Sequence, residues 1–425
     1  MIKESFLKKN KAFKYFKILV FGSSASFIIN AISLYFFSKL YSKEQFGVYA
    51  LFVSFITLGA ILSAFRLNDV IVLQKTKKEA AYISYVCTKI TLYFSILILI
   101  FTTSFGFLSI SFFSANYKIW FYISGALYCL SIIGIFLAWN NKIKRYKVIS
   151  VYRLIQAINL AVFGILFGFF NIELGLILAY TISVAVSSIY LWVKFKSSIK
   201  IVELKKITVY GIKLILLKNR DIVNYSFGLS FFTTALKTLP NFILNSFYGS
   251  GIVGVYDMSL KILNIPINLI STNIGELYYQ KGSVFHTKYK LKFKKLTVNS
   301  IMILFLVAIF SYLPFILYGE ELFSIFLGNK WAIAGVFSEV MSLWYIILFT
   351  TSPMAYIFYI KRELYKLFWF IFISFFVKIS ILFYLVKFYA ENDVIYLYTY
   401  ICISLELLLL LSIIRNTFKD KKDIK

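Results

Sequence analysis

Three lysines lie at the centres of long apolar segments in the second half of the chain. Lys237 stands in the middle of the segment 225–247, and Lys261 and Lys378 occupy the same depth in two later segments. An ammonium group at the centre of a bilayer costs at least about 2.5 kcal/mol, so it normally faces protein or water and not lipid. A membrane protein with such a cationic interior is expected to hold or pass an anion there.

Polar residues recur around two of these lysines at a spacing of three or four, which places them on one face of a helix. We expect these faces to line a water-filled central groove. The alternative is hydrogen bonding between helices in a dry bundle, with Asp257 and Lys261 forming a pair within one helix. The polar positions are Ser226, Ser230, Thr233, Lys237, Asn241 and Asn245 in one segment, Asp257, Lys261, Asn264, Asn268 and Thr272 in the next, and Ser23, Ser26, Asn30 and Ser33 near the N-terminus.

The remaining charges within apolar segments leave more than one interpretation open. Asp257 can neutralise only one of Lys237 and Lys261. Lys378 and Glu406 either pair as a structural tie or contact a ligand. Arg66, at the end of its segment, is either an anchor at the membrane surface or a substrate contact.

The composition indicates a membrane protein. Of the 425 residues, 60% are hydrophobic, and the mean hydropathy is +0.81, which excludes an ordinary soluble domain. About 20 apolar residues are needed to cross the hydrocarbon core of a bilayer as a helix. We predict twelve crossings, at 18–38, 46–66, 88–113, 119–139, 150–170, 174–193, 225–247, 252–275, 297–318, 333–358, 366–386 and 394–414.

The net charge of +28 follows this topology. If both termini are cytoplasmic, 38 lysines and arginines fall on the cytoplasmic side and five on the other. Loops that stay in the cytoplasm carry the excess of basic residues, so this orientation is the expected one. One of these inner connections, at 281–295, is a basic loop. The charge therefore indicates contact with anionic lipid headgroups, and no nucleic-acid partner is expected.

The segments divide into two similar halves. We predict an N-terminal lobe at 1–196, a basic linker with an amphipathic surface helix at 197–224, and a C-terminal lobe at 225–425. At an offset of 207 residues, Tyr41 matches Tyr248, Gly47-Val48-Tyr49 matches Gly254-Val255-Tyr256, and Asn30 matches Lys237. The fold class predicted is an all-α membrane protein with two six-helix lobes, related by a parallel repeat around a central cationic cavity.

All four prolines fall within crossings of the second half, at Pro240, Pro266, Pro314 and Pro353. Proline removes a backbone donor and bends a helix. We therefore expect the second half to be the more flexible one.

The sequence contains no constellation typical of an enzyme. We find no phosphate-binding lysine loop and no Ser/His/Asp arrangement, and the three cysteines are far apart without metal-ligand spacing. We therefore expect a protein that is not an enzyme, with no metal and no cofactor.

Several short motifs resemble a known family, the polysaccharide flippases of the multidrug/oligosaccharidyl-lipid/polysaccharide exporter superfamily, which move O-antigen or capsule repeat units. These motifs are Tyr41–Tyr49 (YSKEQFGVY), Arg66–Asp69 (RLND) and Gly249–Tyr256 (GSGIVGVY), together with twelve crossings in two halves. The resemblance implies a V-shaped pair of lobes that alternates between inward-open and outward-open states. It also implies that Arg66, Lys237 and Lys261 bind the diphosphate or acidic sugars.

The function expected from the residues and the resemblance is a flippase in the bacterial inner membrane. Its substrate would be an undecaprenyl-diphosphate-linked oligosaccharide, moved from the inner to the outer leaflet. Polysaccharide polymerase and chain-length machinery are candidate partners besides membrane lipids. The alternatives are a drug/cation antiporter of the same superfamily and a non-transporting scaffold for envelope assembly. The substrate-binding candidates are Lys237, Lys261, Arg66, Asn30, Asn241, Asn264 and Asn268, and the candidates for coupling or charge pairing are Asp257, Lys378 and Glu406.

Overall fold

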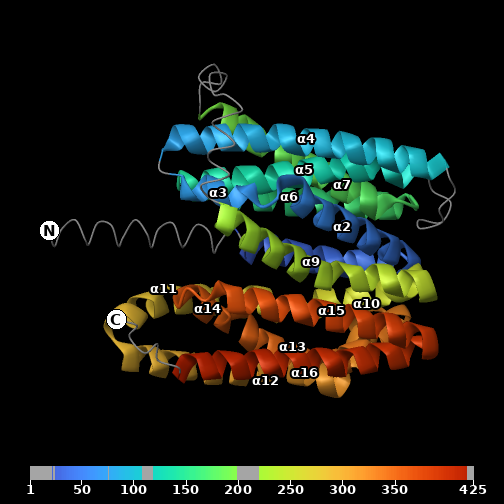
Figure 1. Cartoon of the computed structure of the whole chain (residues 1–425). Helices are drawn as coiled ribbons and strands as arrows, with labels where there is room; N and C mark the ends of the chain where they lie inside the picture. The colour runs from blue at the N-terminus through green and yellow to red at the C-terminus, as the bar shows by residue number, and fades with distance from the viewer. Residues whose placement is uncertain (1–21, 23, 75, 108–117, 199–219, 419–425) are drawn as a thin grey trace. The chain divides into compact units, whose positions relative to one another are not determined.

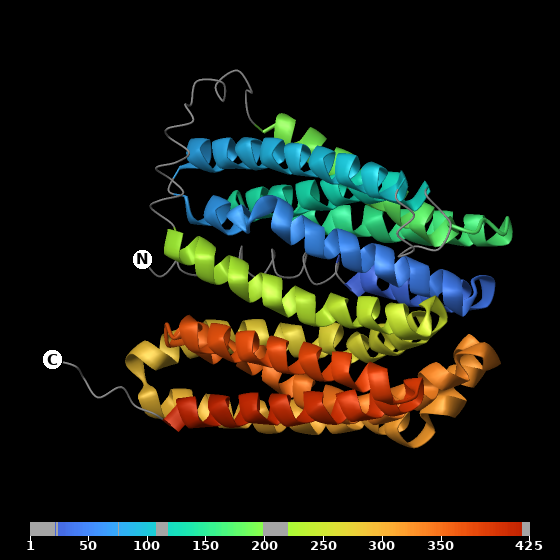
Figure 2. The ribbon, with the colours of Figure 1, turned by 45° about the vertical axis from the view of Figure 1, so that its right-hand side comes forward.

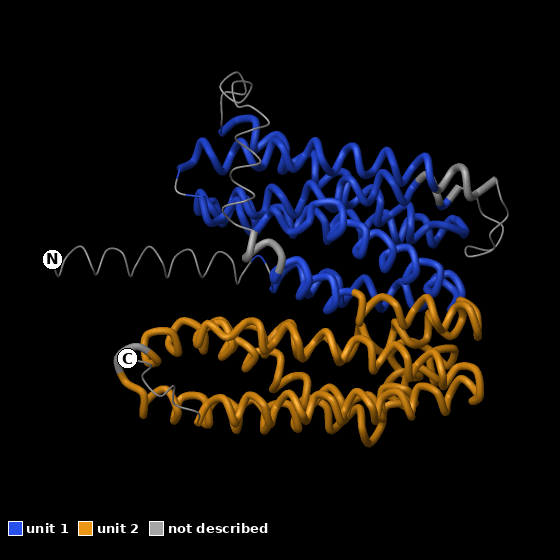
Figure 3. The backbone as a smooth tube through the Cα atoms, in the orientation of Figure 1, with its two compact units in different colours: residues 1–234 blue, residues 235–425 orange. Residues whose placement is uncertain are grey.

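All regular secondary structure in the described part of the chain is helical (Figure 1). The structure is a computed structural model that describes residues 22, 24–74, 76–107, 118–198 and 220–418. The chain forms two compact units, Met1–Thr234 and Ala235–Lys425 (Figure 3). The all-helical membrane fold predicted from the sequence is confirmed.

Unit 1 begins with a helix at Ser24–Leu40. Its centre is aromatic, because Phe136 and Trp139 of α5 pack against Phe195 of α7 with ring centroids 4.7 and 5.5 Å away. These side chains are buried. The following helices are α2 (Lys43–Ala64), α3 (Leu67–Leu73), α4 (Lys77–Phe107), α5 (Lys118–Lys142), α6 (Tyr146–Phe169), α7 (Gly175–Lys196) and the start of α9 (Arg220–Tyr248).

Unit 2 contains the rest of α9 and the helices that follow it. Glycines allow its helices to approach closely: a Cβ on Gly335 of α13 would lie 2.4 Å from the carbonyl oxygen of Gly319 in α12. Figure 2 shows the same ribbon from a second direction. The elements are α10 (Ser250–Pro266), a π-helical segment (Ile267–Ser271), α11 (Thr272–Lys288), α12 (Lys290–Leu327), a 3₁₀ turn (Asn329–Trp331), α13 (Ala332–Met354), α14 (Tyr356–Ile360), α15 (Leu364–Phe388) and α16 (Glu391–Phe418).

Nine helical stretches of the described residues are long and apolar enough to cross a membrane. They correspond to nine of the twelve predicted crossings. The other three are the helix Ser24–Leu40, the helix α9 and the continuous run from α10 through α11. These three carry the polar stripes, and in α9 and the α10–α11 run the polar residues lower the hydropathy of helices that are otherwise long enough.

Two boundaries differ clearly from the sequence prediction. The inner connection at 281–295 was predicted as a loop, and this is wrong: α11 continues to Lys288 and α12 begins at Lys290. The crossing predicted at 88–113 begins earlier, because α4 starts at Lys77. In both places the helix extends beyond the apolar run into polar sequence. Hydropathy marks only the apolar run and therefore does not show where such a helix ends.

The division between the units falls inside α9. Phe227, near the start of α9, packs on Phe65 at the end of α2 with ring centroids 5.4 Å apart, so the first turns of α9 belong to unit 1. Most of the predicted linker, residues 199–219, lies outside the described residues. The division into lobes at 196 and 225 therefore stays a prediction.

The sequence repeat has a structural counterpart in two tyrosines. The hydroxyl of Tyr41 donates to the carbonyl of Gly164 in α6 at 2.6 Å. The hydroxyl of Tyr248, its partner in the repeat, donates to the carbonyl of Tyr389 at the end of α15 at 2.7 Å. The helices α6 and α15 correspond to the fifth predicted crossing of each half, so each tyrosine joins the turn after the first crossing of its half to the fifth.

Candidate functional site

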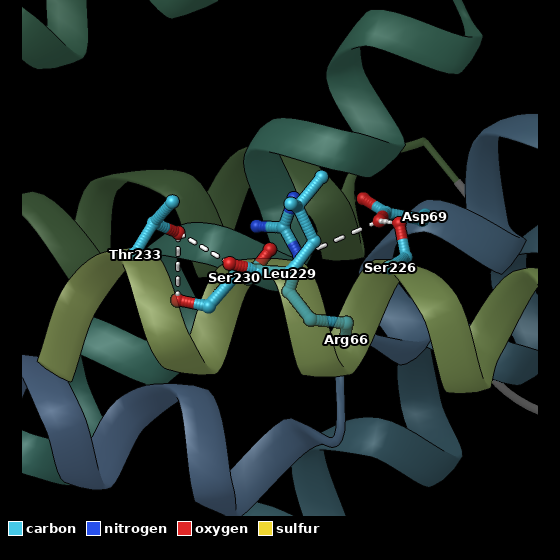
Figure 4. Close-up of polar contacts among 6 residues, drawn as sticks. All are labelled: Arg66, Asp69, Ser226, Leu229, Ser230 and Thr233. Atoms are coloured by element: carbon cyan, nitrogen blue, oxygen red, sulfur yellow. Dashed lines mark hydrogen bonds and ion pairs between the residues drawn. The ribbon is translucent and has the colours of Figure 1, made fainter. Parts of the chain in front are cut away.

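A cluster of charged and polar groups lies where α2 gives way to α3 (Figure 4). The guanidinium of Arg66 lies 3.4 Å from the carboxylate of Asp69, measured from Nε to Oδ2. The hydroxyl of Ser226, at the start of α9, donates to the same carboxylate oxygen at 2.7 Å. Asp69 therefore joins Arg66 to α9, and both charged side chains are about one third exposed.

The backbone at this point is unusual. Phe65 and Arg66 both adopt left-handed conformations, with φ of 42° and 54°. A non-glycine residue in this region costs about 1–3 kcal/mol, so two in succession require compensating contacts. The ring of Phe65 against Phe227 and the Arg66–Asp69 ion pair supply such contacts. Arg66, a candidate substrate contact, thus directly precedes α3 and pairs with an acid in the first turn of that helix.

Lys237 lies near the middle of α9, and its side chain is exposed. Among the described residues, no acid lies within ion-pair distance of its ammonium group. Thr233, one turn earlier, donates its hydroxyl to the carbonyls of Leu229 and Ser230 in its own helix (Figure 4). Asn241, one turn later, is buried.

Lys261 is neutralised within its own helix. Its ammonium lies 2.6 Å from the carboxylate of Asp257, one turn earlier in α10, and the two side chains are 31% and 16% exposed. The next polar residue, Asn264, donates its amide to the hydroxyl of Tyr345 in α13 at 2.9 Å. The polar face predicted for α10 therefore contains the partly exposed Asp257–Lys261 ion pair. Asn264, the next polar residue of that face, is hydrogen-bonded to α13.

A π-helical segment interrupts the polar stripe after Asn264. Pro266 lacks a backbone N–H, and the helix widens over Ile267–Ser271, where the amide of Thr272 bonds to the carbonyl of Ile267. The hydroxyl of Tyr312 in α12 donates to the carbonyl of Leu263 at 2.8 Å. Asn268 lies within this π segment, and its side chain is exposed.

Lys378 and Glu406 form a tie between α15 and α16. Their ammonium and carboxylate groups lie 3.6 Å apart, and the two side chains are only 6% and 13% exposed. Thr351 of α13 donates its hydroxyl to the second carboxylate oxygen at 3.0 Å, and the ammonium lies 5.5 Å from the ring centre of Trp344. Three helices thus enclose this pair.

The candidate residues therefore fall into different settings. Within the units, the structure brings together Arg66 with Asp69, Asp257 with Lys261, and Lys378 with Glu406. Asn30 is exposed on the helix Ser24–Leu40, and the main-chain carbonyl of Asn30 accepts a hydrogen bond from Ser33. Sequence reasoning missed Ser226, Tyr345, Thr351 and Trp344 as partners of these residues, since nothing in a helical spacing specifies contacts between helices.

The described residues offer no cluster of His, Cys, Asp and Glu suited to a metal ion. The three cysteines are free thiols, of which Cys87 and Cys402 are buried and Cys129 is partly exposed.

The fold and these charged positions define a multi-pass helical membrane protein. Residues 36–335 match the family described as "Polysaccharide biosynthesis protein", and the chain belongs to this family. The resemblance seen in the sequence is thereby confirmed. Among curated proteins, no sequence matches this chain.

Solved structures share the fold across nearly the whole chain. A multidrug resistance MATE family transporter of the MOP superfamily, in an inward-facing conformation, matches with a TM-score of 0.72 and 11% identity, over 92% of this chain and 94% of that one. The lipid II flippase MurJ in an inward closed conformation gives 0.74 and 14%, over 94% and 88%. A MOP superfamily transporter from Pyrococcus furiosus gives 0.60 and 13%, over 95% of each. At these identities the likeness concerns the fold.

Proposed function

We propose that this protein is a flippase for undecaprenyl-diphosphate-linked oligosaccharides. It would carry repeat units of O antigen, capsule or a related polysaccharide from the inner to the outer leaflet of the bacterial cytoplasmic membrane. Membership of a polysaccharide biosynthesis family and a fold shared with a lipid II flippase support this class of substrate.

The observation that carries the proposal is the different pairing of the three lysines. Lys261 and Lys378 each have a carboxylate partner, whereas no acid of the described residues pairs with Lys237. The apolar helices of unit 2 therefore hold one surplus positive charge. A surplus cation at mid-membrane depth is stabilised when an anion such as a diphosphate binds beside it.

Lys261 would act second in this proposal. Asp257 holds its ammonium in the free protein, and a diphosphate with two or more negative charges would compete with that carboxylate. Asp257 therefore serves as an internal substitute for the substrate anion and keeps Lys261 oriented until the substrate arrives. Arg66 and the amides of Asn30, Asn241, Asn264 and Asn268 remain candidate contacts of the proposed groove.

The distribution of charge in unit 2 supports the proposed orientation, with both termini cytoplasmic. One end of the unit carries the hairpin between α11 and α12, whose Gly282 contacts Ile360 of α14. The described charges at that end are Lys281, Lys290, Lys292, Lys294, Lys295, Lys361, Arg362, Lys366 and Arg415 against Glu276 and Glu363. The opposite end carries Lys330 and Lys387 against Glu320, Glu321, Glu339, Glu391 and Asp393.

The test replaces the lysines one at a time. Lys237→Ala and Lys261→Ala are expected to abolish surface polysaccharide while the amount of protein in the membrane stays normal. Lys387→Ala is the matched control, because it removes a lysine at the end of α15, outside the proposed groove. Normal polysaccharide in both Lys237→Ala and Lys261→Ala would refute the proposal.

A drug/cation antiporter is the second candidate function, because MATE transporters share the fold. Cation transport by buried residues would require an acid without a basic partner. In unit 2 the described acids at mid-membrane depth, Asp257 and Glu406, are each paired with a lysine. This charge balance favours an anionic substrate.

A scaffold without transport is distinguished by labelling cysteines along α10 and the π segment. In a variant without native cysteines, Asn268→Cys should react with a charged thiol reagent that does not enter lipid, and Lys261→Cys should react more slowly. Met302→Cys, on the exposed apolar face of α12, is the control and should stay unreactive in the membrane. Equal lack of reaction at all three positions would support a dry bundle.

A further inference from the structure

The hairpin between α11 and α12 combines a rigid framework with a strongly basic surface. Between Leu277 and Leu296 the chain contains six lysines and no acidic residue. Only Tyr289 interrupts the helices, with φ of −144° and ψ of 74°. This segment is therefore a folded element that presents charges at fixed positions.

Packing within the hairpin holds the two helices together. The hydroxyls of Tyr278 and Thr297 lie 2.9 Å apart, and the ring of Tyr278 stacks on Phe293 with centroids 6.5 Å apart. His286 lies against the same phenylalanine at 5.2 Å. Gly282 leaves room for Ile360, since a Cβ there would lie 2.8 Å from its Cδ1. The inner face of the hairpin is thus occupied, and Lys281, Lys290, Lys292 and Lys295 are exposed.

The length of α12 fixes the depth of the tip. The stretch 297–317 contains 21 residues and spans about 31 Å, which matches a hydrocarbon core of about 30 Å. The seven residues at 290–296 extend about 10 Å further. One headgroup layer is about 5–8 Å thick, so the tip reaches the outer edge of the lipid headgroups and does not project far into water.

The exposed side chains at the tip are both basic and apolar. Leu291 is 81% exposed, and Tyr289 and Val284 are about half exposed. Lys290 and Lys292 flank Leu291, and the ammonium of Lys292 lies 4.7 Å from the ring centre of Tyr289. Lysines interleaved with aromatic and aliphatic side chains suit the boundary between anionic headgroups and acyl chains.

We propose that the α11–α12 hairpin is a docking surface for anionic phospholipid headgroups. The lysines at 290, 292, 294 and 295 bind lipid phosphates, and Leu291 and Tyr289 insert at the top of the acyl chains. The proposal rests on the cytoplasmic orientation given above, since that leaflet carries the anionic lipids. An acidic protein partner is the competing occupant, and its surface would need no apolar insertion.

The experiment measures lipid composition at the hairpin itself. A fluorophore is attached to Val284→Cys in the full chain without native cysteines, and the protein is reconstituted in mixed bilayers. Quenching by spin-labelled phosphatidylglycerol is compared with quenching by spin-labelled phosphatidylcholine. We expect phosphatidylglycerol to be enriched at least about fivefold, which corresponds to about one lysine acting at an anionic surface.

Two fourfold variants separate the hairpin from general basic charge. In K290Q/K292Q/K294Q/K295Q the enrichment should fall to about one, because four positive charges are removed. The hairpin should stay folded, since Tyr278, Phe293 and Gly282 are unchanged. In the control K77Q/K78Q/K144Q/K147Q, which removes four exposed lysines from unit 1, it should persist. Enrichment that survives the hairpin variant, or that disappears equally in the control, would overturn the proposal. The assay does not measure transport, so its failure would leave the proposed flippase function intact.

Discussion

The two lysine–carboxylate pairs in the apolar helices of unit 2 differ in a way that separates binding from structure. Lys261 and Asp257 lie one turn apart on a single helix and remain partly exposed, at 31% and 16%. Lys378 and Glu406 belong to two helices and are 6% and 13% exposed, with Thr351 and Trp344 beside them. The first pair can open without moving a helix, whereas the second cannot.

This difference shows that a lysine at mid-membrane depth has no fixed role. A buried pair is strongly destabilised when one partner is removed, because the other charge stays buried alone. A pair that solvent reaches contributes little to stability and can exchange its partner for a ligand. The following predictions test this contrast through protein stability, from the largest effect to the smallest.

Lys378→Ala should produce the largest loss of stability. It leaves the carboxylate of Glu406 buried with only Thr351 as a hydrogen-bond donor, at a cost of about 3–5 kcal/mol. Thermal unfolding of the purified protein in detergent measures the effect. The double variant Lys378→Met with Glu406→Leu should recover most of the loss, because it removes both charges. If Lys378→Ala is as stable as the native protein, the Lys378–Glu406 pair contributes no more to stability than the Asp257–Lys261 pair.

Tyr312→Phe should have an intermediate effect. It removes the hydroxyl that donates to the carbonyl of Leu263 beside the π segment, which leaves a buried acceptor unsatisfied at about 1–3 kcal/mol. Thermal unfolding should show this loss, and Tyr318→Phe, at an exposed tyrosine of the same helix, is the control. If the two variants unfold alike, Tyr312 does not support the helix that carries Lys261.

Asp257→Asn should change stability by less than about 1 kcal/mol, because the pair is partly exposed and lies within one helix. Its effect should be on binding: without the competing carboxylate, Lys261 is expected to bind inorganic pyrophosphate more tightly than in the native protein. Isothermal titration with pyrophosphate measures the affinity, and Asp257→Asn with Lys261→Ala is the control that should lose the gain. A large loss of stability in Asp257→Asn would mean that the Asp257–Lys261 pair stabilises the fold, as the Lys378–Glu406 pair is expected to do.

Glu363 and Lys366 form a third pair at the start of α15, where Glu363 precedes the helix and Lys366 lies in its first turn, with their charged groups 2.7 Å apart. Burial acts to raise the pKa of Glu363, but hydrogen bonds from Lys366 and Asn416 and the charges of Lys366 and Lys361 outweigh it and lower the pKa. A lowered pKa gives stability that is present above the unfolded value, about 4.3, and is lost as the pH falls through the folded value.

We therefore expect the melting temperature of the native protein to fall more than that of Glu363→Gln between about pH 5 and pH 3, because the loss begins near the unfolded pKa and continues below it. This effect should be the smallest of the four. Parallel melting curves of the two proteins across that range, taken in the same detergent, provide the measurement. Identical pH dependence would mean that the Lys366 pair contributes no stability that depends on proton binding.

Much of the fold could be predicted because membrane crossings leave a direct signal. Runs of about 20 apolar residues predicted twelve crossings, and nine of them correspond to helical stretches that are long and apolar enough to cross a membrane. The hairpin at 281–295 could not be predicted in this way. Its helices are held by Tyr278, Phe293 and Gly282, whose contacts join residues on two different helices.

The candidate site was predictable in its residues and not in its pairing. Spacing alone suggested that Asp257 could meet Lys261, because residues four apart on a helix are neighbours. Spacing could not show that Ser226 would bond to Asp69, 157 positions earlier in the chain. It also gave no sign that two consecutive left-handed residues, Phe65 and Arg66, separate α2 from α3.

The amino-acid sequence by itself determined that this chain is a helical membrane protein with lysines at mid-membrane depth, because hydropathy and helical period are local properties. Only the tertiary structure decided which lysine has which partner. An ion pair between helices depends on how those helices pack, and a helix can present the same lysine to a carboxylate, to a ring or to water. Lys378 is closed off by α13 and α16, Lys261 pairs with Asp257 of its own helix, and Lys237 has no acid partner among the described residues.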